Sequence, residues 1–201
     1  MSKSRVEEIL DFWFGELSPD GPVSAARRRL WFGGDEETDR LIGERFGRDL
    51  EAARRGDYDG WRDSPQGALA LIVVLDQFPR NIYRGSAQAY ASDAKALNLS
   101  LEGMAQGQDR FLAVAEKAFF YLPLEHAEES AMQRLSVAAF TRLWREAPVG
   151  GKKMAEGFLD FAIRHREIIE RFGRFPHRNA VLGRPSTAEE EAFLREPGSS
   201  F

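Results

Sequence analysis

Two short polar passages carry residue types that suit the binding of a small anion. The first directly follows the apolar run Ala68–Leu75 and contains Asp76, Gln77, Arg80 and Asn81. The second repeats the Phe-Pro and Arg-Asn pairs of the first and contains Arg174, His177, Arg178 and Asn179. The planar fork of an arginine pairs bidentately with a carboxylate or a phosphate, and an asparagine adds an amide donor. We therefore interpret the two passages as walls of one buried polar pocket.

Several acidic residues are predicted to be buried, and each of them needs a partner that compensates its charge. Pro123 is predicted to end one helix, and the next, from about Leu124 to Glu146, projects Glu125 and Glu128 into its apolar sector. Burying an unpaired carboxylate costs several kcal/mol, so each one needs an arginine, a histidine, a metal or a row of donors opposite it. Asp76 needs a cation as well, because the negative end of a helix dipole disfavours a carboxylate in the last turn.

All three histidines of the chain, His126, His165 and His177, fall in or near these passages. A histidine on an apolar helix face is usually a hydrogen-bonded core residue. Together with Glu125 and Glu128, His126 offers the nitrogen and oxygen donors that a zinc, iron or manganese site uses. However, the sequence has no His-Glu-x-x-His or other known ligand spacing. A metal site is therefore the less favoured interpretation of these residues, no metal ligand is assigned, and the sequence identifies no cofactor.

The elements that must position these residues are all helical. Ala68–Leu75 is apolar on every side, which predicts a helix buried inside the protein, and Ser64 with Pro65 forms its start signal. Apolar residues at three- and four-residue spacing predict helices along the rest of the chain, and no alternating strand pattern occurs. We expect one all-α domain over residues 1–201, with antiparallel helix pairs packed as a bundle or a short superhelix. Residues 18–22 predict a loop, and residues 196–201 a frayed tail.

Composition excludes several classes of protein. The chain has 201 residues, of which 43% are hydrophobic and 30% charged, and it has no cysteine. Disulfides and cysteine nucleophiles are therefore excluded, and a reducing compartment fits. No apolar run is long enough to span a bilayer, and the N-terminus does not read as a signal peptide, so we expect a cytoplasmic protein. The net charge of −4 makes nucleic acid an unexpected partner.

Three longer motifs, spread over the chain, resemble those of an uncharacterised bacterial family. They are Leu-Asp-Gln-Phe-Pro-Arg-Asn from Leu75, Leu-Pro-Leu-Glu-His from Leu122, and Arg-Phe-Pro-His-Arg-Asn from Arg174. The family is known as a domain of unknown function with a tetratricopeptide-like helical fold. The resemblance implies an all-helical bacterial protein and no particular activity. Where the family pattern carries a serine after the Leu-Glu-His passage, this chain has Ala127, so a serine nucleophile beside His126 is not expected.

Three functions remain open on these residues. In the first, the pocket binds a carboxylate or phosphate group of a metabolite or of a peptide end. In the second, the protein is a hydrolase in which Glu125, Glu128, His126 and His177 move protons or hold a metal. In the third, the polar residues form a purely structural salt-bridge network, and the helices serve as a scaffold for a protein partner.

Overall fold

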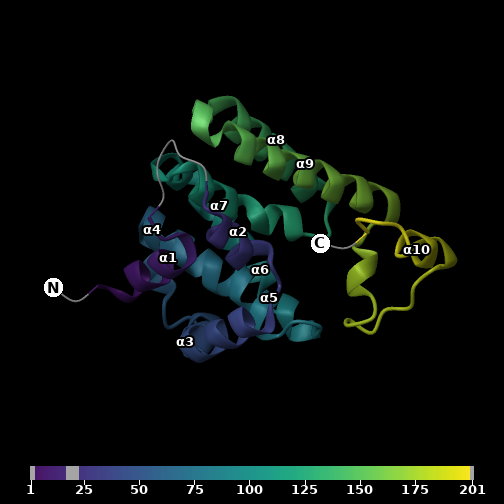
Figure 1. The fold of residues 1–201 in the computed structure, drawn as a ribbon, viewed down its shortest axis with the longest axis horizontal. Coiled ribbons are helices and arrows are strands. Elements are labelled where there is room, and N and C mark those ends of the chain that lie inside the picture. The colour runs from purple at the N-terminus through teal and green to yellow at the C-terminus, as the bar shows by residue number, and fades with distance from the viewer. Residues whose placement is uncertain (1–2, 17–22, 200–201) are drawn as a thin grey trace.

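The computed structural model describes residues 3–16 and 23–199, and within these ranges the chain forms helices and no strand. The α-helices are α1 (Arg5–Phe14), α2 (Ala25–Phe32), α3 (Glu36–Arg55), α4 (Pro65–Ile72), α5 (Phe78–Ile82), α6 (Asp93–Ala105), α7 (Val114–His126), α8 (Ser130–Glu146), α9 (Val149–Phe172) and α10 (Ala188–Phe193). Short 3₁₀ turns are η1 (Asp59–Asp63), η3 (Ala87–Tyr90), η4 (Gln108–Phe111) and η5 (Pro176–Arg178), and η2 (Val73–Gln77) is a π turn. The predicted all-α fold class is confirmed (Figure 1).

The apolar run forms the buried centre of the molecule, as its composition predicts. Every side chain from Ala68 to Leu75 is at most 1% exposed, and α1, α6 and α7 pack around α4. Ser64 caps the helix by accepting a hydrogen bond from the backbone N–H of Gly67 at 3.2 Å. Gly67 itself is required by packing, because a Cβ there would lie 2.1 Å from the carbonyl oxygen of Trp61. The start of the central helix is thus fixed by local sequence.

The central helix does not end at Asp76. It continues through the π turn η2 into α5, so the prediction that Asp76 lies in the last turn is wrong. The backbone N–H of Phe78 bonds to the carbonyl of Val73, five residues back. Pro79 has no N–H for the carbonyl four residues before it, and the wider π turn lets the chain pass this point without breaking.

The boundary between α7 and α8 also differs from the prediction. Pro123 lies inside α7, which ends at His126, and α8 begins only at Ser130. Gln133 stabilises this boundary, because its side-chain amide donates to the carbonyl oxygens of Glu125 at 2.7 Å and Ala127 at 2.8 Å. Glu125 is therefore buried from the end of α7 rather than from the start of α8.

The helices after α5 pack mainly on their sequence neighbours. α6 packs on α7, and α7 on α8 and α9. α8 and α9 lie side by side (Figure 1), and the two residues between them make the pair antiparallel. The predicted antiparallel pairing holds there, while the tetratricopeptide-like superhelix remains a prediction. Within the described ranges, no helix has the length and apolar composition needed to cross a membrane.

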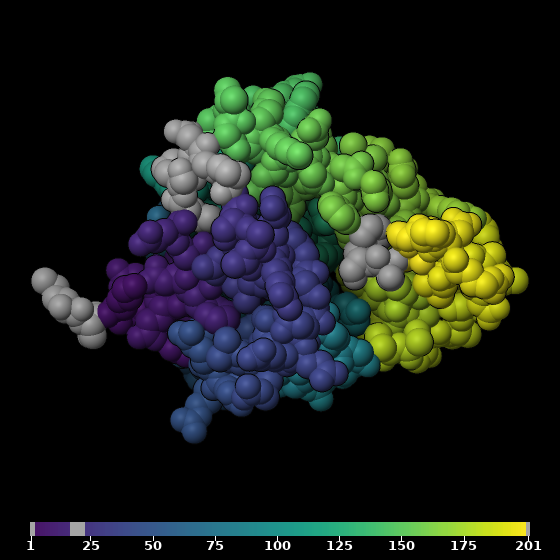
Figure 2. All heavy atoms as spheres, in the orientation of Figure 1, coloured from purple at the N-terminus to yellow at the C-terminus, as the bar shows by residue number. Residues whose placement is uncertain are grey.

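Residues 173–199, called the C-terminal arm below, follow α9 and carry η5 and α10. The arm lies at one end of the molecule, in yellow in Figure 2. Its apolar contacts form a small cluster of their own, in which Phe175 packs with Ile168 and Ile169 of α9. Residues 196–199 form a turn, with Ser199 Oγ donating to the carbonyl of Leu194 at 3.2 Å. Residues 200–201 of the predicted tail and the predicted loop at 18–22 lie outside the described residues.

Candidate functional site

The polar residues that converge beside the central helix are called the Asp76 cluster below. Its members are Asp76, Gln77, Arg80, Asp93, Glu125, His126, His165 and Arg178. They come from the η2–α5 segment, the first turn of α6, the end of α7, the C-terminal half of α9, and the C-terminal arm. Segments distant in sequence thus meet at one place.

Asp76 is the best-satisfied member of the cluster. Its side chain is fully buried, and one carboxylate oxygen accepts a hydrogen bond from the amide of Gln77. The other oxygen lies 2.7 Å from His126 Nδ1 and 3.2 Å from Arg80 Nη1. Burial by itself raises the pKa of Asp76, but Arg80 and His126 outweigh burial and lower that pKa to about 2. Asp76 is therefore a carboxylate at neutral pH.

Two arginines share a single carboxylate on α6. Arg80 makes a bidentate pair with Asp93, with both N···O distances at 3.0 Å. Arg178 Nη1 is 3.6 Å from the same carboxylate, which is too long for a hydrogen bond. Because Asp93 is already committed to Arg80, it compensates the charge of Arg178 only in part.

Arg178 is held by aromatic rings. The residue is 6% exposed, and its guanidinium lies 4.6 Å from the ring centroid of Tyr90 and 4.5 Å from that of Phe175. Its Nε is buried and has no hydrogen-bond partner among the described residues. Burial, and then the charge of Arg80, lower the pKa of Arg178. Arginine stays charged in proteins, so a cation with an unfilled donor remains.

Glu125 forms a second buried pair with His165. Glu125 Oε1 is 3.3 Å from His165 Nδ1, and Glu125 Oε2 has no hydrogen-bond partner within the described part of the chain. His165 Nδ1 also lies 2.8 Å from the carbonyl oxygen of Phe161, so this nitrogen carries the proton. Burial, and then the nearby charge of Asp76, raise the pKa of Glu125 well above its ordinary value. Burial lowers the pKa of His165 to about 3, so this histidine is neutral at pH 7.

The other two histidines lie beside this pair. The rings of His126 and His165 are 6.4 Å apart, and His177 lies 5.6 Å from the ring of Phe175. Burial and then Arg80 lower the pKa of His126, although Asp76 opposes them. Burial and then Arg178 lower the pKa of His177 to about 4. All three histidines are therefore neutral bases at pH 7.

The other predicted site residues lie outside the cluster. Glu128 accepts a bidentate pair from Arg184, at 2.6 and 2.9 Å, and also the backbone N–H of Phe175 at 2.7 Å. Arg174 pairs with Glu190 of α10 at 2.6 and 2.8 Å. These contacts hold the C-terminal arm together and attach it to the α7–α8 link. They do not extend the cluster.

The two asparagines do not face each other as pocket walls would. Asn81 donates to Asp39 of α3 at 2.8 Å, in a separate ion pair that Asp39 makes with Arg84. Asn179 is used inside the arm, where its side chain contacts Ser186 and accepts from Arg184. The repeated Arg-Asn pair thus places the two arginines near one carboxylate and sends the asparagines to structural contacts.

A bacterial family of unknown function, DUF924, matches residues 9–198. This chain belongs to that family. A solved protein of unknown function from Agrobacterium tumefaciens is 36% identical, with a TM-score of 0.79 over 94% of this chain and 96% of the other. No curated protein matches the chain. The predicted resemblance to an uncharacterised bacterial family is confirmed, and it brings no activity with it.

In this DUF924 protein, the cluster contains a residue that sequence reasoning missed. Asp93 lies in the first turn of α6, where acidic residues are common because they favour the helix dipole. Its local sequence therefore does not distinguish it from an ordinary acidic residue at a helix start. Tyr90, which lies in the 3₁₀ turn before α6 and stacks on Arg178, was not among the predicted site residues. The available signal was that Arg80 and Arg178 together needed one more carboxylate than the predicted site residues supplied.

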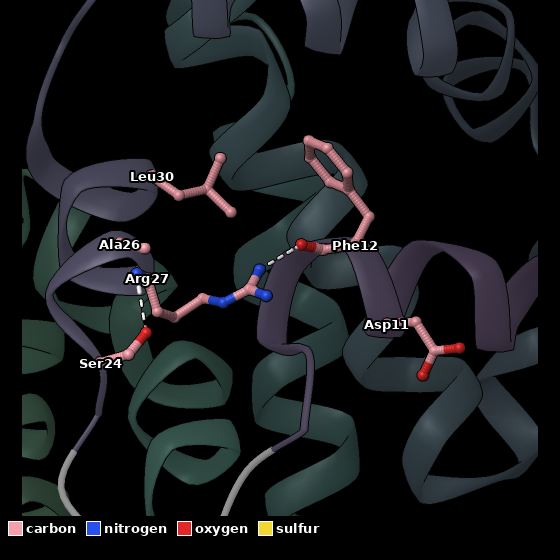
Figure 3. Close-up of a pocket in the computed structure, with 6 residues that line it drawn as sticks. All are labelled: Asp11, Phe12, Ser24, Ala26, Arg27 and Leu30. Carbon is pink, nitrogen blue, oxygen red and sulfur yellow. Dashed lines mark hydrogen bonds between the residues drawn. The ribbon is translucent and has the colours of Figure 1, made fainter.

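Two further features of the DUF924 chain bear on the site. Among the residues that the structure describes, no three histidine, aspartate or glutamate side chains are grouped so as to hold a metal ion. A surface pocket of about 410 Å³ lies between α1 and α2, away from the cluster (Figure 3). Arg27 in that pocket donates to the backbone carbonyls of Phe12 and Trp13 at the end of α1, and Trp31 Nε1 donates to the Trp13 carbonyl as well, at 2.8 Å. Its guanidinium thus serves the fold.

Proposed function

We propose that the Asp76 cluster binds a small molecule through a carboxylate or phosphate group, with Arg178 as the main contact. The observation that carries this proposal is the partner deficit of Arg178, since its Nε has no acceptor and its nearest carboxylate is 3.6 Å away. A buried cation without full compensation costs several kcal/mol. A bound anion would supply the missing acceptor.

The surroundings of Arg178 favour a ligand that presents two oxygens in a plane. Tyr90 and Phe175 hold the guanidinium by its faces, so its donor edge has a fixed direction. A fixed edge suits the fork geometry of a carboxylate or a phosphate and reduces the entropy lost on binding. A metabolite or a peptide end with a free carboxylate fits this description. We place the protein in the bacterial cytoplasm, in keeping with a chain that has no cysteine.

The test compares wild type with Arg178→Met in thermal-shift and calorimetric titrations with inorganic phosphate, acetate, succinate and benzoate. We expect at least one anion to stabilise wild type, by about 2.7 kcal/mol at a hundred times its dissociation constant. Arg178→Met should abolish the shift. Arg171→Met is the matched control, because Arg171 is about half exposed and pairs with Glu189 on the arm.

Two outcomes would contradict the proposal. One is equal stabilisation of wild type and Arg178→Met. The other is the absence of any stabilising anion combined with a lower melting temperature in Arg178→Met, which would mark the cluster as a structural network.

A further inference from the structure

We infer that the Asp76 cluster is an acid–base site that hydrolyses an ester bond in a small carboxylate-bearing molecule, with His126 as the proton acceptor and Glu125 as the proton donor. This inference rests on the proposed function, because Arg178 is assigned to hold the carboxylate of the substrate. It goes further by giving the neighbouring polar groups separate chemical roles.

The geometry around His126 sets its role. Asp76 is a carboxylate and only accepts hydrogen bonds, so the nitrogen 2.7 Å from it, Nδ1, must carry the proton. In a neutral imidazole, Nε2 then has the lone pair. No described residue bonds to Nε2, and 14% of the side chain remains exposed. A water molecule can therefore reach a base whose orientation Asp76 fixes.

The position of Glu125 gives it the complementary role. Glu125 is 3% exposed. Its Oε1 faces the neutral His165, and its Oε2 has no hydrogen-bond partner within the described structure. A protonated carboxyl there has a hydrogen available to donate. The pKa values of the two carboxyl groups in this site are thus shifted in opposite directions, that of Asp76 downward and that of Glu125 upward, which is the arrangement expected where one group orients a base and another supplies a proton.

Contacts between rings place these groups near Arg178. His165, the partner of Glu125, lies 5.4 Å from the ring of Phe175, and that same ring stacks on Arg178 at 4.5 Å. His126 is 6.4 Å from His165, measured between ring centres. The two groups that move protons and the cation that holds the anion are therefore linked through neighbouring rings within one cluster.

Water is the nucleophile in this scheme. The chain has no cysteine, and the residue after His126 is Ala127, which carries no nucleophile. Among the residues described, His126 has no hydroxyl group as a hydrogen-bond partner. The nucleophile must then come from solvent.

The reaction balances with water alone. The water oxygen bonds to the ester carbonyl carbon while His126 Nε2 takes one water proton. The bond from that carbon to the alcohol oxygen breaks, and the proton of Glu125 passes to this oxygen. The proton on His126 then returns through water to the Glu125 carboxylate. The products are a carboxylic acid and an alcohol, and both residues regain their starting states.

The experiment follows hydrolysis of monoethyl succinate by proton NMR, with ethyl acetate as the ester that lacks a carboxylate. We expect wild type to cleave monoethyl succinate in preference to ethyl acetate. Glu125→Gln and His126→Gln should each lose about 10²–10⁴-fold in kcat. Arg178→Met should mainly raise KM. Glu129→Gln is the matched control, because Glu129 is an exposed carboxylate near the end of α7 and should leave the rate unchanged.

A second substrate separates the two roles. The nitrophenolate of p-nitrophenyl hemisuccinate leaves without being protonated, so Glu125→Gln should lose much less with this ester than with monoethyl succinate. His126→Gln should lose a similar factor with both esters, because water must still be deprotonated. Equal losses for Glu125→Gln with both esters would overturn the assignment of Glu125 as the proton donor.

The two proposals fail in different ways. If succinate binds to wild type and not to Arg178→Met, and yet monoethyl succinate stays intact, the inference is wrong and the binding function stands. Hydrolysis at the wild-type rate in His126→Gln would also overturn it. If no anion binds through Arg178, both proposals fail together.

Discussion

The centre of the molecule and the C-terminal arm are held in place by different forces. Around the central helix, aromatic side chains such as Trp13, Trp31 and Phe119 pack edge to face with their ring centroids 4.7 to 5.6 Å apart. The arm has only a small apolar cluster around Phe175 and is attached through ion pairs such as Glu128–Arg184. Apolar packing resists changes of pH and salt, whereas ion pairs respond to both. The Asp76 cluster lies where the two regions meet.

The largest expected effect tests the apolar side of this comparison. Phe119 is fully buried and contacts Trp13, Phe14 and Trp31. Phe119→Ala should lower the free energy of unfolding by about 3–5 kcal/mol, because it leaves a cavity that packed rings cannot fill. The partly buried Phe193 of α10 is the counterpart in the arm, and Phe193→Ala should cost about 1 kcal/mol. Urea unfolding measures both, and similar losses would show that the arm belongs to the same core.

The second-largest expected effect concerns Asp76, in the cluster where the core and the C-terminal arm meet. Asp76→Asn leaves Arg80 without one of its two carboxylate partners and should cost about 3 kcal/mol at pH 7. The pKa of Asp76 is lowered in the folded state, so its stabilisation is present above the unfolded pKa and is lost as the pH falls toward 2. The difference between wild type and Asp76→Asn should therefore shrink on acidification. A difference that stays constant with pH would mean that Asp76 acts through packing alone.

The contribution of Glu125 to stability should depend on pH in the opposite direction. Its folded pKa is raised, so the unfolded chain releases the proton first, and stability falls as the pH rises above the unfolded pKa. Glu125→Gln keeps the shape of the side chain and removes its titration, so the variant does not lose stability in this way as the pH rises. The variant should be close to wild type in stability near pH 4 and should become the more stable of the two as the pH rises toward 6. Thermal melts over that pH range measure the difference, and a less stable variant at pH 6 would show that Glu125 is ionised in the folded protein.

The smallest expected effect separates the arm from the core. Glu128→Gln weakens a bidentate pair that is about one quarter exposed, so the cost should be about 1 kcal/mol, near the value for surface pairs. Hydrogen exchange should speed up in residues 175–199 and stay unchanged in α4 and α7. Glu129→Gln, one residue away and exposed, is the control. Faster exchange throughout the protein would contradict an arm attached mainly by ion pairs.

Sequence patterns were sufficient for the helical fold and for part of the cluster. The all-apolar run with its Ser64-Pro65 start signal predicted a buried helix, and charged groups beside it had to find partners. Asp76, Arg80, Glu125 and Arg178 follow from that argument. Prolines were less informative, because Pro79 and Pro123 both lie within continuing helical segments. Whether a proline stops a helix depends on tertiary packing, which local sequence does not contain.

The remaining errors have one physical cause. Arg174, Arg178 and Arg184 look alike in sequence, yet the first pairs with Glu190, the last with Glu128, and only Arg178 reaches the cluster. The choice depends on which carboxylate each side chain reaches after folding. Asp93 was missed for the same reason, because its partners lie 13 and 85 residues away.

The π turn at Val73–Gln77 has a consequence for how such chains can vary in length. A helix advances by about 100° per residue, so deleting one residue here would turn Asp76 away from His126 while leaving an unbroken apolar segment behind it. The shortened protein should still fold, because its apolar helix remains intact, but the contact between Asp76 and His126 should be lost. Insertions and deletions within these five positions therefore offer a way to separate the architecture of the protein from its chemistry.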